Sequence, residues 1–122
     1  MGLRVKEEVE REGLDLAEFL RESTRVAVRT GRRLEAARAA YRPAADYPGH
    51  ELGERLRTVA ELIDANLPTR IYYVTLDGFD THSDQAAAHA ALLGQLGDAL
   101  AAFLEDLAAH GHAERVLTLT FS

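Results

Sequence analysis

The sequence contains no cysteine, which excludes disulfide bonds, thiolate zinc sites and cysteine nucleophiles together. Its wholly apolar runs are only a few residues long, far below the ~20 residues needed to cross a bilayer, so we expect no membrane span. No basic segment followed by an apolar stretch opens the chain, and we expect no export signal in it. A glycine-rich phosphate loop, a G-x-S-x-G elbow and a His-Glu-x-x-His pair are absent as well.

The charge balance is acidic, with 20 Asp and Glu against 14 Lys and Arg and a formal net charge of −6. This is the wrong sign for a protein that binds a phosphate backbone, so we expect no nucleic-acid partner. The 122 residues are 47% hydrophobic and 28% charged, as in one small globular domain or a piece of a larger one. Val, Ile and Thr are scarce outside two short runs, which favours helix with a little strand.

Helical patterns fill the first half of the chain. Residues 1–13 are mostly charged and are expected to form a tail or a frayed helix before the folded part, residues 14–122. Asp15 and Glu18 have the spacing of a capping box that opens the next helix. A helix with an apolar stripe is also predicted between Leu52 and Leu67, after a proline-rich loop. The first of these helices carries a basic row of period four, whose role the sequence leaves open: Arg21, Arg25, Arg29 and Arg33.

Two short β-branched and aromatic runs predict strands at 70–76 and 115–121, both of the type that is covered on two faces. An apolar stripe from His89 to Leu107 predicts a long helix over 86–110 between them. Strand, helix, strand is a βαβ unit, so we expect parallel strands with a right-handed crossover. The expected fold class is therefore α/β, a helix-rich fragment with a parallel βαβ unit.

The predicted sheet is incomplete. Two parallel strands leave open edges and cannot cover both faces, and the sequence ends at Ser122, directly after the second strand. We therefore interpret the chain as part of a larger α/β domain. Open edges and the apolar stripe of 52–67 predict self-association, so we expect a dimer or larger homo-oligomer with one of these surfaces at the contact.

The run from Asp77 to Gln85 is the most informative for function, because it gathers three carboxylates and an imidazole after a predicted strand, where open α/β sheets bind ligands. Asp80 and His82 can point the same way in an extended loop, and their oxygen and nitrogen donors suit zinc, manganese or a similar divalent ion. The alternative is a solvated loop in which Asp80 caps a turn or pairs with an arginine. Phe79 is expected to turn inward as an anchor, and Asp84 to cap the next helix.

The remaining candidate residues are histidines and one serine. His89 lies on the apolar stripe of the long helix, which favours a buried, hydrogen-bonded histidine over a ligand. Ser122 follows a strand, the usual place of a nucleophile, but nothing after it supports that role. The histidines near helix ends are expected to be solvated: His50, His110 and His112.

Residues 41–122 resemble the bacterial proteins grouped as domain of unknown function 1501, which are sulfatase-like members of the alkaline-phosphatase superfamily. The most specific part of the resemblance is the sequence Gly-Phe-Asp-Thr-His at 78–82, followed by the His-x-x-Leu-Leu pattern that begins at His89. Ser122 matches the first position of a second family motif, in which an acidic residue and Phe-Gly-Arg follow the serine. The resemblance implies a three-layer α/β/α domain of the alkaline-phosphatase type with a metal-assisted hydrolytic site at the strand ends.

The resemblance also implies ligands, a cofactor and a substrate class. Asp80 and His82 fall on the motif positions of the metal ligands, with Asp77 and His89 as further candidates. Asp77 stands where the family often has glycine. The implied cofactor is a divalent ion (zinc, manganese, calcium or magnesium), the implied substrate is a sulfate or phosphate ester, and family members are often exported by the twin-arginine route.

The function we expect is that of a truncated sulfatase- or phosphatase-like metal-dependent hydrolase. Later family segments with further ligands are missing from the sequence, so we expect the chain to be inactive alone. The alternative is a non-enzymatic interaction or scaffold module that associates through helical stripes and a sheet edge.

Overall fold

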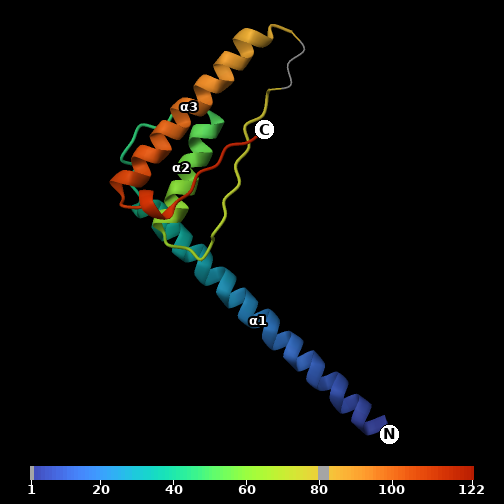
Figure 1. Cartoon of the computed structure of the whole chain (residues 1–122). Coiled ribbons are helices and arrows are strands. Elements are labelled where there is room, and N and C mark those ends of the chain that lie inside the picture. The colour runs from blue at the N-terminus through green and yellow to red at the C-terminus, as the bar shows by residue number, and fades with distance from the viewer. Residues whose placement is uncertain (1, 80–82) are drawn as a thin grey trace. The chain divides into compact units, whose positions relative to one another are not determined.

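The computed structural model describes residues 2–79 and 83–122, and the chain divides into two units, Met1–Ala36 and Ala37–Ser122. Regular structure in the described residues is helical (Figure 1). The elements are α1 (Gly2–Ala40), α2 (Glu51–Asp64), α3 (Gln85–Ala109) and the short 3-10 helix η1 (Ala113–Arg115). The second and third helices confirm the helices predicted from the apolar stripes.

The helix α1 is continuous, so the predicted capping box is wrong. Asp15 and Glu18 lie inside the helix and not at its first turn, and Gly13 does not interrupt it. One glycine costs a helix interior only about 1 kcal/mol relative to alanine, which the flanking helix formers can offset. The basic row on this helix is exposed, and Arg25 forms an exposed ion pair with Glu22 at 3.7 Å.

The core of the second unit lies between α2 and α3. Its main side chains are spaced by four residues on each helix and are at most 7% exposed: Leu52, Leu56 and Ala60 on α2, and Ala99, Phe103 and Leu107 on α3. Steps of four keep these residues on one face of each helix. The stripe of 52–67 therefore packs against α3 and is not a free surface for self-association.

The start of α2 depends on two close contacts. His50 is the N-cap residue, and its Nδ1 accepts a hydrogen bond from the Gly53 N–H at 3.2 Å. The prediction that His50 is solvated is therefore wrong, since its ring satisfies one of the free amides at the helix start. Gly53 itself is buried against the preceding loop, where a Cβ would lie 2.2 Å from the carbonyl oxygen of Pro48.

The main correction concerns the predicted strands. Residues 70–77 and 116–122 run as extended chain without regular secondary structure (Figure 1), and residues 2–79 and 83–122 contain no strand and no sheet. The α/β class, the parallel βαβ unit and the three-layer α/β/α domain are therefore wrong for this structure. Each extended segment packs one side on the helical core, through Val74, Leu76 and Val116. Two short parallel segments without further strands gain too little from pairing to form a stable ladder.

By length and composition alone, α3 could cross a bilayer, and it is the only such helix in the part of the chain that the structure describes. Core helices of soluble proteins pass the same test. Because α3 packs against α2 through Phe103 and Leu107, this property is only a weak indication of a membrane span.

Candidate functional site

The predicted motif begins at the end of the first extended segment. Gly78 has a φ of +104°, a conformation that is strained for any residue with a Cβ. It lies against α3, where a Cβ at this position would be 3.5 Å from the side chain of Leu92. Asp77 is exposed beside it. Asp80 and His82 lie outside the described residues, so their assignment as metal ligands stays a prediction.

Phe79 and His89 form an edge-to-face contact beside the motif, with ring centroids 5.6 Å apart and an interplanar angle of 75°. Together with Gln85 and Ala86 they line an open hollow. Phe79 is 41% exposed and His89 is exposed, so the predictions of an inward Phe79 and a buried His89 are wrong. The reason is that the buried residues of α3 begin only at Ala99, and its first turns have no core in which to bury a side chain.

The first residues of α3 differ from the prediction as well. Asp84 is the N-cap residue, but its backbone is left-handed (φ 49°) and its side chain makes no capping hydrogen bond. A capping side chain normally requires extended backbone at this position, so the predicted cap is wrong. The side chains that the structure describes, those of residue 13 and residues 15–79 and 83–122, include no group of three or more His, Cys, Asp or Glu that could hold a metal ion. Asp77 and His89 therefore do not make a metal site by themselves.

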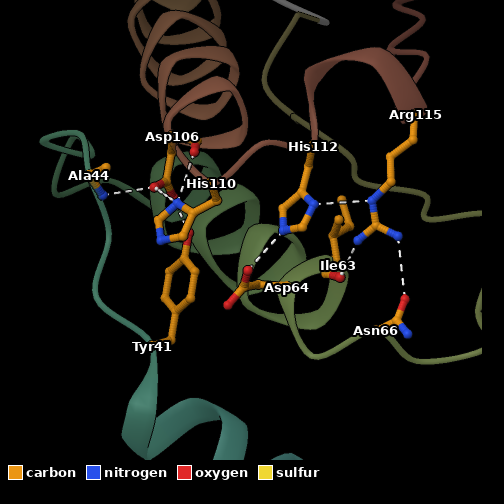
Figure 2. Close-up of polar contacts among 9 residues, drawn as sticks. All are labelled: Tyr41, Ala44, Ile63, Asp64, Asn66, Asp106, His110, His112 and Arg115. Atoms are coloured by element: carbon orange, nitrogen blue, oxygen red, sulfur yellow. Dashed lines mark hydrogen bonds and ion pairs between the residues drawn. The ribbon is translucent and has the colours of Figure 1, made fainter.

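A second polar cluster surrounds Asp106, a fully buried residue of α3 (Figure 2). Its Oδ2 accepts hydrogen bonds from the hydroxyls of Tyr41 and Tyr47, the latter at 2.7 Å. Its Oδ1 accepts from the Ala44 N–H at 2.7 Å and lies 3.0 Å from Nδ1 of His110. Both carboxylate oxygens are thus occupied, which offsets the cost of burying the charge. The cluster holds the loop that precedes α2 against α3. It presents no free acceptor to a ligand.

A chain of contacts around His112 joins η1 to the end of α2 (Figure 2). Arg115 Nε donates to His112 Nδ1 at 3.1 Å, and His112 Nε2 lies 2.8 Å from Asp64 Oδ1. Because Nδ1 accepts, the neutral ring carries its proton on Nε2 and donates it to the carboxylate. Arg115 also donates to the Ile63 carbonyl at 2.9 Å. The prediction that His112 is solvated is wrong, since its side chain is only 16% exposed.

The Asp106 cluster shifts the pKa of its members. Burial acts to raise the pKa of Asp106, but the hydrogen bonds that it accepts and the charge of His110 outweigh burial and hold this pKa below 3.8. The hydrogen bond to the Asp106 carbonyl, together with the Asp106 charge, raises the pKa of His110 above 6.5. Burial and the same carboxylate raise the pKa of Tyr41 and Tyr47 above 10.0. His110 was also predicted to be solvated, but it is tied into this cluster.

These shifts predict a stability maximum in mildly acidic solution. The Asp106 contribution is complete above the unfolded carboxyl pKa of about 3.9 and is lost as the pH falls through the lower folded pKa. The His110 contribution is complete below the unfolded imidazole pKa of about 6.5 and is lost as the pH rises through the higher folded pKa. Urea unfolding at a series of pH values should therefore show the greatest stability between about pH 4 and 6.5. The variant His110→Gln should no longer lose stability as the pH rises above this window. An unchanged loss of stability in this variant would contradict the contribution assigned to His110.

A family model described as "Protein of unknown function (DUF1501)" matches residues 5–122. The chain belongs to the DUF1501 family. This match confirms the family resemblance, first seen over residues 41–122, and extends it into α1. No curated protein and no solved structure matches the chain significantly.

Within this DUF1501 chain, Asp106 is the residue that sequence reasoning missed. A signal was present, because Asp106 falls three residues after Phe103 and next to Leu107, inside the apolar stripe of α3. An acid in such a stripe predicts a buried carboxylate with compensating donors. Its partners Tyr41 and Tyr47 lie about sixty residues earlier in the sequence, and periodicity does not connect residues that far apart.

Proposed function

We propose that this DUF1501 chain contributes part of the metal site of a sulfatase- or phosphatase-like hydrolase, with Asp80 and His82 as ligands. The observation that supports this most is the position of His89. Its exposed ring contacts the ring of Phe79, the motif residue that directly precedes Asp80 in the sequence, and both rings line the open hollow. The motif then supplies one oxygen donor, from Asp80, and one nitrogen donor, from His82. Such a mixed donor set suits zinc, manganese and similar divalent ions.

The number of ligands limits what the chain does alone. A divalent ion at this site would polarise a phosphoryl or sulfuryl oxygen and lower the pKa of a bound water or alkoxide. Catalytic zinc sites typically use three protein ligands and a water. Asp80 and His82 supply two, so the proposed set is one protein ligand short of such a site. We therefore propose weak metal binding and no ester hydrolysis by the isolated chain.

Isothermal titration calorimetry with Zn²⁺ and Mn²⁺ tests the proposed ligands. We expect weak binding that Asp80→Ala and His82→Ala each reduce by about tenfold or more, because each variant removes one of two donors. Binding should also weaken in acidic solution, since protons compete with the metal for an imidazole ligand.

Asp98→Ala is the matched control for this titration, because Asp98 is an exposed acid on α3 outside the motif. It should leave metal binding unchanged, and equal losses in all three variants would contradict the assignment. The isolated chain should not hydrolyse an aryl sulfate or an aryl phosphate. Metal-dependent hydrolysis that Asp80→Ala abolishes would show that the chain is a complete enzyme.

A further inference from the structure

The two extended segments carry a strongly exposed apolar surface. We define this extended surface by five side chains that are 71–86% exposed: Ile71, Tyr73, Leu117, Leu119 and Phe121. Among residues 15–79 and 83–122, no other large apolar side chain is as exposed. Hydrophobic burial is the main driving force of association, so a surface of this kind is costly to leave in water.

The five side chains form one continuous surface across both segments. The rings of Tyr73 and Phe121 lie with centroids 6.1 Å apart, which joins the first segment to the second. In the first segment alternate residues, among them Val74 and Leu76, face the helical core, whereas the second segment contacts the core through Val116 and is exposed from residue 117 to 122. Figure 1 shows both segments in extended form beside α2. The extended surface thus combines the outer side of the first segment with the exposed residues of the second segment.

The area of the extended surface fits a protein contact. Five large apolar side chains at this exposure present on the order of 800 Å². The largest apolar patch on a typical monomer is roughly 300–600 Å². A stable interface buries about 800 Å² on each partner. One further copy of the same surface would therefore supply the area that a stable dimer needs.

The backbone of the segments also favours a strand-like partner. Neither segment forms a ladder in the described part of the chain, although the Thr75 carbonyl accepts a hydrogen bond from Arg55 at 2.8 Å. Extended chains with unpaired amides add a further strand readily. Residues 71–76 and 116–122 contain no charged side chain, so the usual barrier to edge pairing is missing. Two copies of one uncharged segment can pair without like-charge repulsion.

We propose that the extended surface binds a second copy of this chain, with residues 116–122 of the two copies pairing about a two-fold axis. Pairing in this way gives alternate amides of both copies hydrogen-bond partners and brings Leu117, Leu119 and Phe121 of the two copies into cross-strand contact on one face. Other chains could offer an apolar strand. A second copy of this chain offers both an uncharged segment at 116–122 and an apolar area that matches the extended surface.

Light scattering and sedimentation of the full chain over a wide concentration range test the proposal. We expect a species of twice the 13.4 kDa of one chain. Leu119→Lys should weaken its formation by about tenfold or more, because it places a charge in the contact. Thr118→Pro should also weaken it, since proline removes an amide donor but leaves the apolar side chains in place, whereas Thr118→Ala should not.

Two controls make the test specific. Leu104→Lys changes a 51% exposed leucine on α3, outside the extended surface, and should leave the dimer intact. The chain has no cysteine of its own, so Leu119→Cys should give a disulfide-linked dimer on mild oxidation and Leu104→Cys should not. If the chain is a monomer at every concentration, the proposal is wrong and the extended surface binds a different protein. Equal loss of the dimer in Leu104→Lys and Leu119→Lys would overturn it as well.

Discussion

Replacing Asp106 with alanine is expected to lower the free energy of unfolding by about 3–5 kcal/mol. The carboxylate is fully buried and accepts hydrogen bonds from Tyr41, Tyr47 and Ala44. Its removal leaves the three donors without this acceptor, whereas the ring of His110 loses the carboxylate but keeps its contact with the backbone carbonyl of residue 106. Unsatisfied buried donors lose their hydration without compensation, and the loop before α2 loses its attachment to α3. Urea unfolding followed by circular dichroism measures the loss.

Two variants separate this effect from a general loss of charge. Asp98→Ala removes an exposed acid from the same helix and should change stability by no more than about 0.5 kcal/mol. Tyr47→Phe removes only one of the hydrogen bonds and should cost about 1.5–3 kcal/mol, less than Asp106→Ala. If Asp106→Ala unfolds at the same urea concentration as the unmodified chain, the cluster does not hold the fold together.

Gly53→Ala is expected to destabilise the protein by about 1–3 kcal/mol, although alanine is the better helix former. The new methyl group would lie 2.2 Å from the Pro48 carbonyl oxygen and 3.1 Å from its carbonyl carbon. Both atoms belong to the backbone of the loop, so a side-chain rotation cannot relieve the clash. The loop or the first turn of α2 must move, which also disturbs the cap from His50. Thermal unfolding should show a lower Tm.

Gly94→Ala is the matched control for Gly53→Ala. Gly94 lies inside α3, and a Cβ there would meet no other atom within 4 Å. The substitution should therefore stabilise the helix by up to about 1 kcal/mol and raise the Tm. Shifts of opposite sign are expected for the two variants. A rise in Tm for both would mean that the loop can move away from residue 53 at little cost.

The sequence by itself determined the parts of this protein that depend on neighbouring residues. The stripes of α2 and α3, the loop between α1 and α2 and the extended backbone of 70–76 and 116–121 follow from periodicity and from residue type over a few positions. Family membership followed from the short sequence at 78–82 and from the patterns around it, and the match over residues 5–122 confirms it. Each of these features is encoded within one continuous stretch of chain.

Only the tertiary structure decided which contacts those elements make. A β-branched run specifies an extended backbone, but strand pairing needs a second backbone as hydrogen-bond partner, and the described residues pair no strand with 70–76 or 116–122. His89 lies on an apolar stripe, yet it is exposed because the core covers only the second half of α3. Asp106 is surrounded by donors from residues 41–47, and that arrangement arises only when α3 and this loop come together. Burial depends on which distant surfaces meet, and local sequence patterns do not contain that information.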